Sequence, residues 1–307
     1  MIPAEARDQN LRAGPLTTVQ DLGRPGYAHL GVPRSGALDQ DAHRLANRLV
    51  GNGPQAAGLE STLTGLTLRA LGPVVVAVCG AVAPVRRDGR PAAWAEPITL
   101  RAGEILDVGA ALRGVRSYVA FAGGVAVPPV LGSRSTDVLS GLGPPPVRDG
   151  DVLPIGVPEG APRAADTYPV SVTAPVVPGG PGGPGGGDYA TESAFELPVL
   201  PGPRPESFAP EALRALTGGV YTVSQASNRI ALRLDGPPLP RAGADTIPSE
   251  GAVLGAIQVP ADGRPIVFLA DHPPTGGYPV IAVVPIAALG AAAQAAPGAR
   301  LRFRTAA

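Results

Sequence analysis

Glycine and proline cut this chain into short apolar runs, and that pattern constrains its fold more than any other feature. The 307 residues include 42 Gly and 38 Pro. The runs between them are rich in β-branched residues, as at 73–85 and 115–122. Short strands at close spacing, joined by Gly and Pro turns and accompanied by one or two helices, are typical of barrels and sandwiches. We therefore expect a mainly β fold and no series of βαβ units.

Hairpin signals occur in both halves of the sequence. Asp88-Gly89 and Asp262-Gly263 each lie between apolar runs, and Asp-Gly is a typical residue pair of a tight hairpin turn. Residues 229–234 alternate between apolar residues and others, which predicts a strand with one buried face and with Arg229 and Arg233 on the opposite face. Further strands are expected at 27–30, 59–68, 98–100, 105–108, 197–200, 251–259, 266–270, 281–284 and 301–304.

The stretch 17–51 contains the clearest helix. Apolar residues recur along 42–49 at the spacing of one helical face, and polar residues occupy the other positions. Asp39 is placed to cap the N-terminus of this helix, and Gly51 is placed to end it. We interpret Asp39 as a cap rather than as a catalytic acid.

The charges are balanced, with 25 basic and 25 acidic residues and no block of either sign. This balance does not favour nucleic acid or an anionic membrane as a partner. All 25 basic residues are Arg, so the sequence contains no Lys. This polypeptide therefore provides no Walker A lysine, no Schiff-base lysine and no biotin-carrying lysine, and any nucleotide or biotin chemistry must use another chain.

Cys79 is the only cysteine, which excludes an internal disulfide and a cysteine-based metal site. It lies in the apolar run 74–85, where we expect a small buried thiol in a strand. That run is too short to span a bilayer, and the N-terminal residues lack the apolar core of a signal peptide. His29, His43 and His272 do not have the spacing of a zinc site, so no metal is expected. We expect a reduced, cytoplasmic protein.

A Gly/Pro-rich segment is the best candidate for a domain boundary. Residues 178–187 read PGGPGGPGGG, and such a run has no side chains with which to build a core. The two halves echo one another weakly, since AGEILDV (102–108) resembles PGARLRF (297–303). The expected organisation is an N-terminal domain at 1–165, a linker at 166–194 and a C-terminal domain at 195–307.

The segment 270–279, ADHPPTGGYP, is the strongest local candidate for a site. Asp271 follows a buried strand, and Thr275 supplies a hydroxyl. Gly276-Gly277 let backbone N–H groups come close enough to a ligand to stabilise an oxyanion. An ordinary wide connection between strands explains these residues equally well from the sequence alone.

Other polar residues are compatible with binding a small molecule. Arg229, next to Asn228, can clamp a carboxylate with two hydrogen bonds, although a solvated arginine on the outside of a strand is the commoner arrangement. Glu250 places a carboxylate beside a turn, where capping is the alternative role. Arg24 lies in a tight Gly/Pro turn. His272 is the one histidine that we would test as an acid or base.

Several long motifs resemble the segments of one family in their usual order. They are TVQDLGRPGYAHLGVPRSGALDQDA (18–42), YTVSQASNRIALRLDG (221–236), SEGAVLGAIQVP (249–260) and ADHPPTGGYPVIA (270–282). The family they resemble is that of the 5-oxoprolinase C subunit, also called allophanate hydrolase subunit 2 or KipI antagonist, and it also forms part of the carboxyltransferase component of urea carboxylase. The resemblance spans nearly the whole chain and implies two tandem cyclophilin-like β-barrels. Members often carry Gln-Thr or Val-Thr before the Gly pair, whereas this chain has Pro274 before Thr275.

The resemblance implies one component of a heteromeric, ATP-dependent 5-oxoprolinase, a hydrolase that opens the cyclic amide 5-oxo-L-proline to L-glutamate. ATP would be held by the complex, and the implied partners are a KipI-like B subunit and a LamB/YcsF-like A subunit. One alternative is the carboxyltransferase component of a biotin-dependent urea or amide carboxylase, with biotin carried by another chain. The other is a non-catalytic antagonist that binds a KipI-like kinase inhibitor. The residues to which we assign roles on this basis are Asp271, Glu250 and Thr275 in catalysis, and Arg24, Arg229, Asn228, Gly276, Gly277 and Tyr278 in substrate binding.

Overall fold

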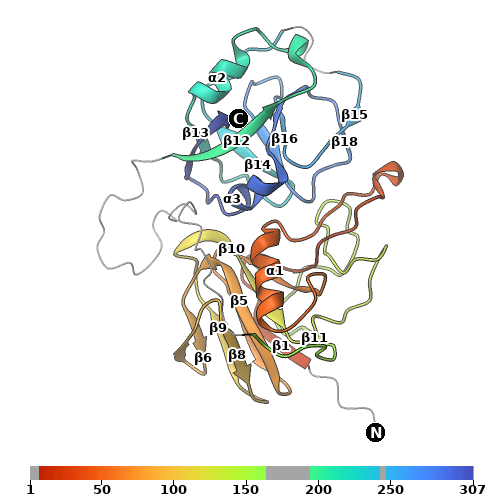
Figure 1. The fold of residues 1–307 in the computed structure, drawn as a ribbon, viewed down its shortest axis with the longest axis vertical. Coiled ribbons are helices and arrows are strands. Elements are labelled where there is room, and N and C mark those ends of the chain that lie inside the picture. The colour runs from red at the N-terminus through yellow and green to blue at the C-terminus, as the bar shows by residue number, and fades with distance from the viewer. Residues whose placement is uncertain (1–6, 164–193, 243–246, 307) are drawn as a thin grey trace, which may run out of the picture. The chain divides into compact units, whose positions relative to one another are not determined.

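The structure is a computed structural model, and it describes residues 7–163, 194–242 and 247–306 (Figure 1). The chain divides into two compact units. The first takes its described residues from Met1–Arg24, Ser35–Asp137 and Gly141–Ala174, and the second from Pro25–Arg34, Val138–Ser140 and Pro175–Ala307. Two short segments of the first half thus belong to the second unit. The linker expected at 166–194 lies outside the described residues except for Ala194.

The first unit contains two antiparallel sheets, which we describe in order of their strands. The six-stranded sheet consists of β11 (Val152–Pro154), β1 (Arg7–Arg12), β4 (Leu66–Ala70), β9 (Ile105–Val108), β6 (Val85–Arg87) and β7 (Arg90–Ala92). The five-stranded sheet consists of β2 (Thr17–Gln20), β3 (Gly58–Thr62), β10 (Arg113–Phe121), β5 (Val74–Val82) and β8 (Pro97–Leu100).

The core of the first unit lies between these two sheets. Leu59 and Val119 are directly paired in the five-stranded sheet, and they belong to one buried cluster with Leu66 and Leu106 of the six-stranded sheet. Because side chains alternate along a strand, the neighbouring residues Glu60, Tyr118 and Cys79 form a row on the opposite face. The burial of Cys79 in a strand, as predicted, is confirmed.

Helix α1 (Gln40–Leu49) packs on that opposite face, along β5 and β10 (Figure 1). Its apolar side, which includes Leu45 and Leu49, is buried in a second cluster. The Asp39 carboxylate accepts a hydrogen bond from the Ala42 N–H at 3.1 Å, and Gly51 has φ of 81° beyond the last turn. The predicted N-cap and terminating glycine are therefore confirmed.

The second unit contains a closed barrel. Its strands follow the order β12 (Phe195–Pro201), β19 (Val280–Val283), β16 (Ala256–Gln258), β17 (Ile266–Phe268), β14 (Ala231–Asp235), β13 (Tyr221–Val223) and β20 (Arg300–Thr305), and β20 pairs in parallel with β12. A separate two-stranded ladder is formed by β15 (Glu250–Gly251) and β18 (Thr275–Gly276). The short helices are α2 (Ala212–Gly218) and α3 (Leu289–Ala293), with 3-10 turns at Pro205–Ser207 and Ile286–Ala288.

The two faces of the barrel wall are distinguished by register. Leu232, Val267 and Ile257 pair across β14, β17 and β16, and all three are buried. The next row is Arg233, Ile266 and Gln258, and Arg233 is exposed. The first row therefore lines the barrel interior, and the second row lies on its outer surface.

The prediction of a mainly β, barrel-rich fold with few short helices is confirmed. Three local predictions are wrong. The strand predicted at 251–259 is interrupted after β15 ends at Gly251 and resumes only at β16, because the chain turns at Leu254-Gly255, where Gly255 has φ of 83°. The strand predicted at 27–30 is instead a 3-10 turn, Ala28–Leu30, that ends at Gly31 with φ of 75°. The single strand predicted at 59–68 is two strands, β3 and β4, because Leu63 and Gly65 have φ of 57° and 69° and reverse the chain.

Among the described residues, none of the helices combines the length and the apolar character required to cross a bilayer.

Candidate functional site

The segment 270–279 is anchored at its first end by a buried ion pair. Arg229 Nε donates to Asp271 Oδ2 at 2.9 Å, and Nη2 donates to Oδ1 at 3.1 Å. The side chains are 1% and 0% exposed. The Val138 N–H also donates to Asp271 Oδ2, at 3.2 Å. Both carboxylate oxygens are thus engaged, and the two charges compensate each other in a site closed to solvent.

The position of Arg229 differs from the sequence prediction, which places it on the outer face of a strand. In the structure it precedes β14 and points inward. The cause is local: Asn228 Oδ1 accepts hydrogen bonds from the N–H groups of Ile230 and Ala231, at 2.8 and 3.2 Å. This Asx turn reverses the chain just before β14 begins. Asn228 therefore has its side-chain oxygen committed to the backbone.

The other end of the segment lies over the outer surface of the barrel. In the β15–β18 ladder, Glu250 is paired with Gly276 and Gly251 with Thr275. Ala252, just after β15, packs against a cluster on the outer barrel surface that includes Phe268. The ladder therefore covers part of this surface. We call the residues 250–251 and 275–276 the flap.

Gly276 allows a close approach to the Gln258 side chain. A Cβ at this position would lie 2.5 Å from Nε2 of Gln258. That Nε2 donates to the Tyr278 carbonyl at 3.1 Å, and the Ile247 N–H donates to the Gly277 carbonyl at 2.9 Å. The Gly pair thus lets the segment pass directly over the Gln258 amide before the chain reaches Tyr278.

Glu250 and Thr275, both predicted to be catalytic, lie on the flap. Glu250 forms an ion pair with Arg204 at 2.6 Å, and its side chain is 23% exposed. Thr275 is exposed. The structure places these two residues on adjacent strands, whereas Asp271 lies at the buried end of the same segment.

A pocket of about 430 Å³ opens beside Tyr278. Arg233, Arg264 and Ile266 line it together with Ser224. Arg264 is paired with Asp235 at 2.9 Å, and both side chains are more than half exposed. No residue in the described part of the chain pairs with the Arg233 guanidinium. The pocket therefore offers one uncommitted guanidinium, an aromatic ring and a hydroxyl, which is a set suited to a small ligand with a carboxylate.

Two residues of this pocket were missed by the sequence reasoning. Arg233 was identified as a guanidinium on the outer face of a strand but was not assigned to the site. The alternation carried part of the signal, because it places Arg233 on the exposed row, but it places Arg229 on the same row and so did not distinguish the two. Arg264 follows the predicted turn at Asp262-Gly263, and only the pairing of β16 with β17 brings it to the pocket.

Arg24 belongs to the first unit. It is 2% exposed, and its guanidinium donates to the carbonyl oxygens of Ser135 and Val130. The preceding Asp21 accepts hydrogen bonds from the hydroxyls of Ser133 and Ser135, each at 2.6 Å. The predicted tight turn around Arg24 is therefore held by several hydrogen bonds to residues 130–135.

His272 is held by stacking. Its ring lies 5.4 Å from that of Phe268, with an angle of 9° between the planes. Nδ1 lies 2.8 Å from the Pro273 carbonyl, which can only accept, so Nδ1 carries the hydrogen. The ring is 6% exposed. Within the described ranges, no group of three His, Cys, Asp or Glu side chains is close enough to hold a metal ion.

Comparisons with known proteins agree with this architecture. The family described as carboxyltransferase domain, subdomain A and B, matches residues 30–305. The chain is 36% identical to the 5-oxoprolinase C subunit of Escherichia coli over 277 residues, which cover 89% of this chain and 83% of that protein.

Longer proteins match as well. Urea amidolyase of Lachancea kluyveri is 34% identical over 94% of this chain, but the match covers only 16% of that protein. The crystal structure of the K. lactis urea amidolyase superposes with a TM-score of 0.86 and 30% identity, over 100% of this chain and 19% of that one. From the extent of these matches, the chain belongs to the carboxyltransferase domain, subdomain A and B, family.

Proposed function

We propose that this chain is one component of a heteromeric 5-oxoprolinase, which converts 5-oxo-L-proline to L-glutamate with hydrolysis of ATP. The observation that carries this proposal is the similarity to the 5-oxoprolinase C subunit of Escherichia coli, which extends over most of both chains. A second protein of that name, from Haemophilus influenzae, is 29% identical over 93% of this chain and 87% of its own length.

The pocket beside Tyr278 supports the same reading, because 5-oxo-L-proline is a small ring that carries one carboxylate. Arg233 is available to bind that carboxylate, and Arg264 adds a second guanidinium at the same pocket. The Tyr278 ring supplies an apolar surface for the lactam ring. Arg229 keeps the role of a predicted carboxylate ligand only if a ligand displaces Asp271, since the two are paired in a buried site.

Opening an unstrained amide requires activation of its carbonyl oxygen and delivery of water. Glu250, Asp271 and Thr275 remain predicted catalytic residues, and the amides of Gly276 and Gly277 remain predicted oxyanion donors. Of the two carboxylates, Glu250 is the better candidate base, because it is accessible and is held near Thr275 by the flap.

The binding of ATP is the part of the proposed reaction for which this sequence offers the least support. The sequence has no Lys to bind phosphates in a Walker A loop. We therefore assign ATP binding to partner chains, with a KipI-like B subunit and a LamB/YcsF-like A subunit as the proposed partners.

Reconstitution tests this proposal. The chain is co-expressed with these two partner chains, and ATP hydrolysis and glutamate formation are measured with and without 5-oxo-L-proline. We expect 5-oxoproline-dependent hydrolysis that requires all three chains. ATP hydrolysis and glutamate formation that persist undiminished when this chain is omitted would contradict the proposal.

The urea amidolyase matches favour a second candidate, a carboxyltransferase component of a biotin-dependent carboxylase. The absence of Lys means that biotin would have to be carried on another chain. The same preparations, supplied with a biotinylated carrier protein, bicarbonate, ATP and urea, distinguish this candidate. Carboxylation of urea without 5-oxoproline turnover would replace the first proposal, and tight binding of the KipI-like chain without any turnover would favour an antagonist.

A further inference from the structure

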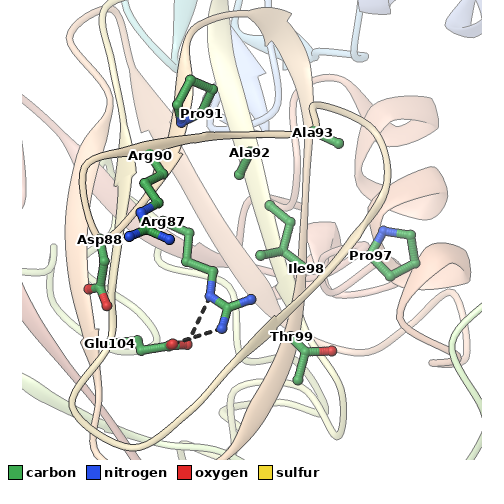
Figure 2. A pocket seen from close by; sticks show the side chains of 10 residues that line it. All are labelled: Arg87, Asp88, Arg90, Pro91, Ala92, Ala93, Pro97, Ile98, Thr99 and Glu104. Atoms are coloured by element: carbon green, nitrogen blue, oxygen red, sulfur yellow. Dashed lines mark hydrogen bonds and ion pairs between the residues drawn. The ribbon is translucent and has the colours of Figure 1, made fainter.

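A large pocket of the first unit has no part in the proposed reaction. It measures about 730 Å³ and lies between the β6–β7 hairpin and β8 (Figure 2). Figure 2 shows the charged side chains Arg87, Asp88, Arg90 and Glu104 on one side of the pocket, and Ile98 with Pro97 on the other. A ligand that fills this space meets charge on one side and an apolar wall on the other.

The pocket lies where the two sheets of the first unit end. β7 is the outer strand of the six-stranded sheet, and β8 is the outer strand of the five-stranded sheet. Each of these strands contains a proline, Pro91 and Pro97. Proline has no N–H to donate and is a common device against pairing at a sheet edge. The opening is therefore poorly suited to an added strand and better suited to a small molecule.

The hairpin side carries two guanidiniums and two carboxylates, and both carboxylates are already bonded, Glu104 to Arg87 and Asp88 to the Ile105 N–H at 2.8 Å. Arg87 donates to both oxygens of Glu104, at 2.9 and 2.7 Å, and this interaction raises the pKa of Arg87 and lowers that of Glu104. Figure 2 shows the remaining nitrogen of the Arg87 guanidinium turned away from Glu104 toward the pocket. Arg90 is exposed on the same side, and none of the described residues pairs with its guanidinium.

The same four-residue sequence forms a wall of the pocket beside Tyr278. Residues 88–91 and 262–265 both read Asp-Gly-Arg-Pro, and in both the Asp-Gly pair lies in the connection between two antiparallel strands, β6 and β7 or β16 and β17. Their glycines have φ of 74° and 75°. In each pocket one guanidinium is paired with a carboxylate, Arg87 with Glu104 and Arg264 with Asp235, and a second one is not paired with any described residue. An isoleucine, Ile98 or Ile266, lines each pocket.

We propose that the pocket of the first unit is a second binding site for a small organic carboxylate with a flat apolar body, the counterpart of the pocket beside Tyr278. Arg90 and the free nitrogen of Arg87 bind the carboxylate, and Ile98 packs against the body of the ligand. The Arg87–Glu104 pair fixes the first guanidinium before the ligand arrives, which reduces the entropy lost on binding. This site is independent of the reaction proposed above.

Trp94 provides a reporter near the pocket, since it is the only tryptophan and follows Ala93, which lines the pocket. The full chain is titrated with benzoate while Trp94 fluorescence is followed, and benzamide serves as the uncharged probe of the same shape. We expect a saturable change with benzoate and at least a roughly tenfold weaker response to benzamide, since benzamide lacks the charge that the two guanidiniums bind. Equal responses to the two probes would overturn the proposal.

Variants locate the site. Arg90→Gln should weaken benzoate binding about tenfold, the effect of one lost charge-assisted hydrogen bond. Arg86→Gln is the matched control, because Arg86 is exposed on the same hairpin, donates to the Gly89 carbonyl and does not line the pocket. Arg233→Gln, in the second unit, should leave the Trp94 titration unchanged. Unaltered binding in Arg90→Gln would overturn the proposal, and a normal thermal unfolding curve for that variant shows that loss of binding is not loss of fold.

Discussion

Two arginine–carboxylate pairs of the second unit have the same chemistry and opposite surroundings. Arg229–Asp271 has 1% and 0% of its side chains exposed, whereas Arg264–Asp235 has 59% and 51%. Each includes an N–O distance of 2.9 Å. The N–O distance therefore does not distinguish the two pairs, whereas their exposure to solvent does.

Burial decides what each pair can do. A buried pair compensates its charges internally, and removing one partner leaves an uncompensated charge in a site without water. An exposed pair contributes little to stability and can exchange its partner for a ligand. Arg229–Asp271 thus holds the 270–279 segment in place, whereas the exposure of Arg264–Asp235 is compatible with the binding role that we propose for the pocket lined by Arg233 and Arg264.

The largest effect is expected from breaking the buried pair. Arg229→Met should lower the free energy of unfolding by about 3–5 kcal/mol, because it leaves the Asp271 carboxylate buried without its guanidinium. Urea denaturation of the isolated chain measures this loss. A destabilisation below about 1 kcal/mol would show that Asp271 is not held in a closed site.

His43 in the first unit extends the comparison between buried and exposed groups, because it is a buried titratable side chain that is neutral rather than charged. Burial lowers the pKa of His43 to about 4 from an ordinary 6.5. Above pH 6.5 both folded and unfolded states are neutral at this residue. As the pH falls from 6.5 to 4 only the unfolded state gains a proton, so stability is lost by about 3 kcal/mol.

The His43 prediction is checked by unfolding at a series of pH values. His43→Gln keeps a side chain able to accept from Asn47, which lies 3.1 Å from His43 Nε2. The difference in unfolding free energy between the parent chain and this variant should shrink as the pH falls through this window. A difference that is independent of pH would contradict the assignment, because carboxylate titrations are common to both proteins.

A smaller effect is expected at the flap. Gly276→Ala puts a Cβ 2.5 Å from Gln258 Nε2 and should cost about 1–3 kcal/mol, because the amide must move and lose its bond to the Tyr278 carbonyl. Combining it with Gln258→Ala should recover part of the loss, so the two changes should not be additive. Strict additivity in a double-mutant cycle would indicate that the close approach does not restrict this position.

The smallest effect is expected from the exposed pair. Arg264→Gln should change the free energy of unfolding by no more than about 0.5 kcal/mol, since exposed ion pairs contribute little. The same urea experiment used for Arg229→Met measures it. A loss of unfolding free energy comparable to that of Arg229→Met would contradict the distinction between the buried and the exposed ion pair.

Local features of the sequence predicted much of the fold. The Asp39 cap, the Gly51 terminator and the two Asp-Gly hairpins each depend on a few adjacent residues, and each is present in the structure. The 3-10 turn at 28–30 was missed, because the four residues 27–30 between two glycines are too few to distinguish a short strand from a turn.

The candidate site was harder to predict, because its arrangement depends on distant contacts. Arg229 and Asp271 are 42 residues apart, and no local pattern shows that they pair. The alternation alone made Arg229 and Arg233 equal candidates for the exposed face of the strand. The Asx turn at Asn228 sets the start of β14 after Arg229, so only Arg233 lies in the strand and is exposed. In the segment 270–279, Gly276 lies close to the Gln258 amide, whereas the approach of the Gly276 and Gly277 N–H groups to a ligand stays a prediction.

The most direct test of the central claim is the KM for 5-oxo-L-proline of the reconstituted complex containing Arg233→Gln. If Arg233 binds the substrate carboxylate, KM should rise about tenfold or more, because one charge-assisted hydrogen bond is lost. A complex containing Arg86→Gln should keep the parent KM. An unchanged KM in the Arg233→Gln complex would contradict the assignment of this pocket as the substrate site.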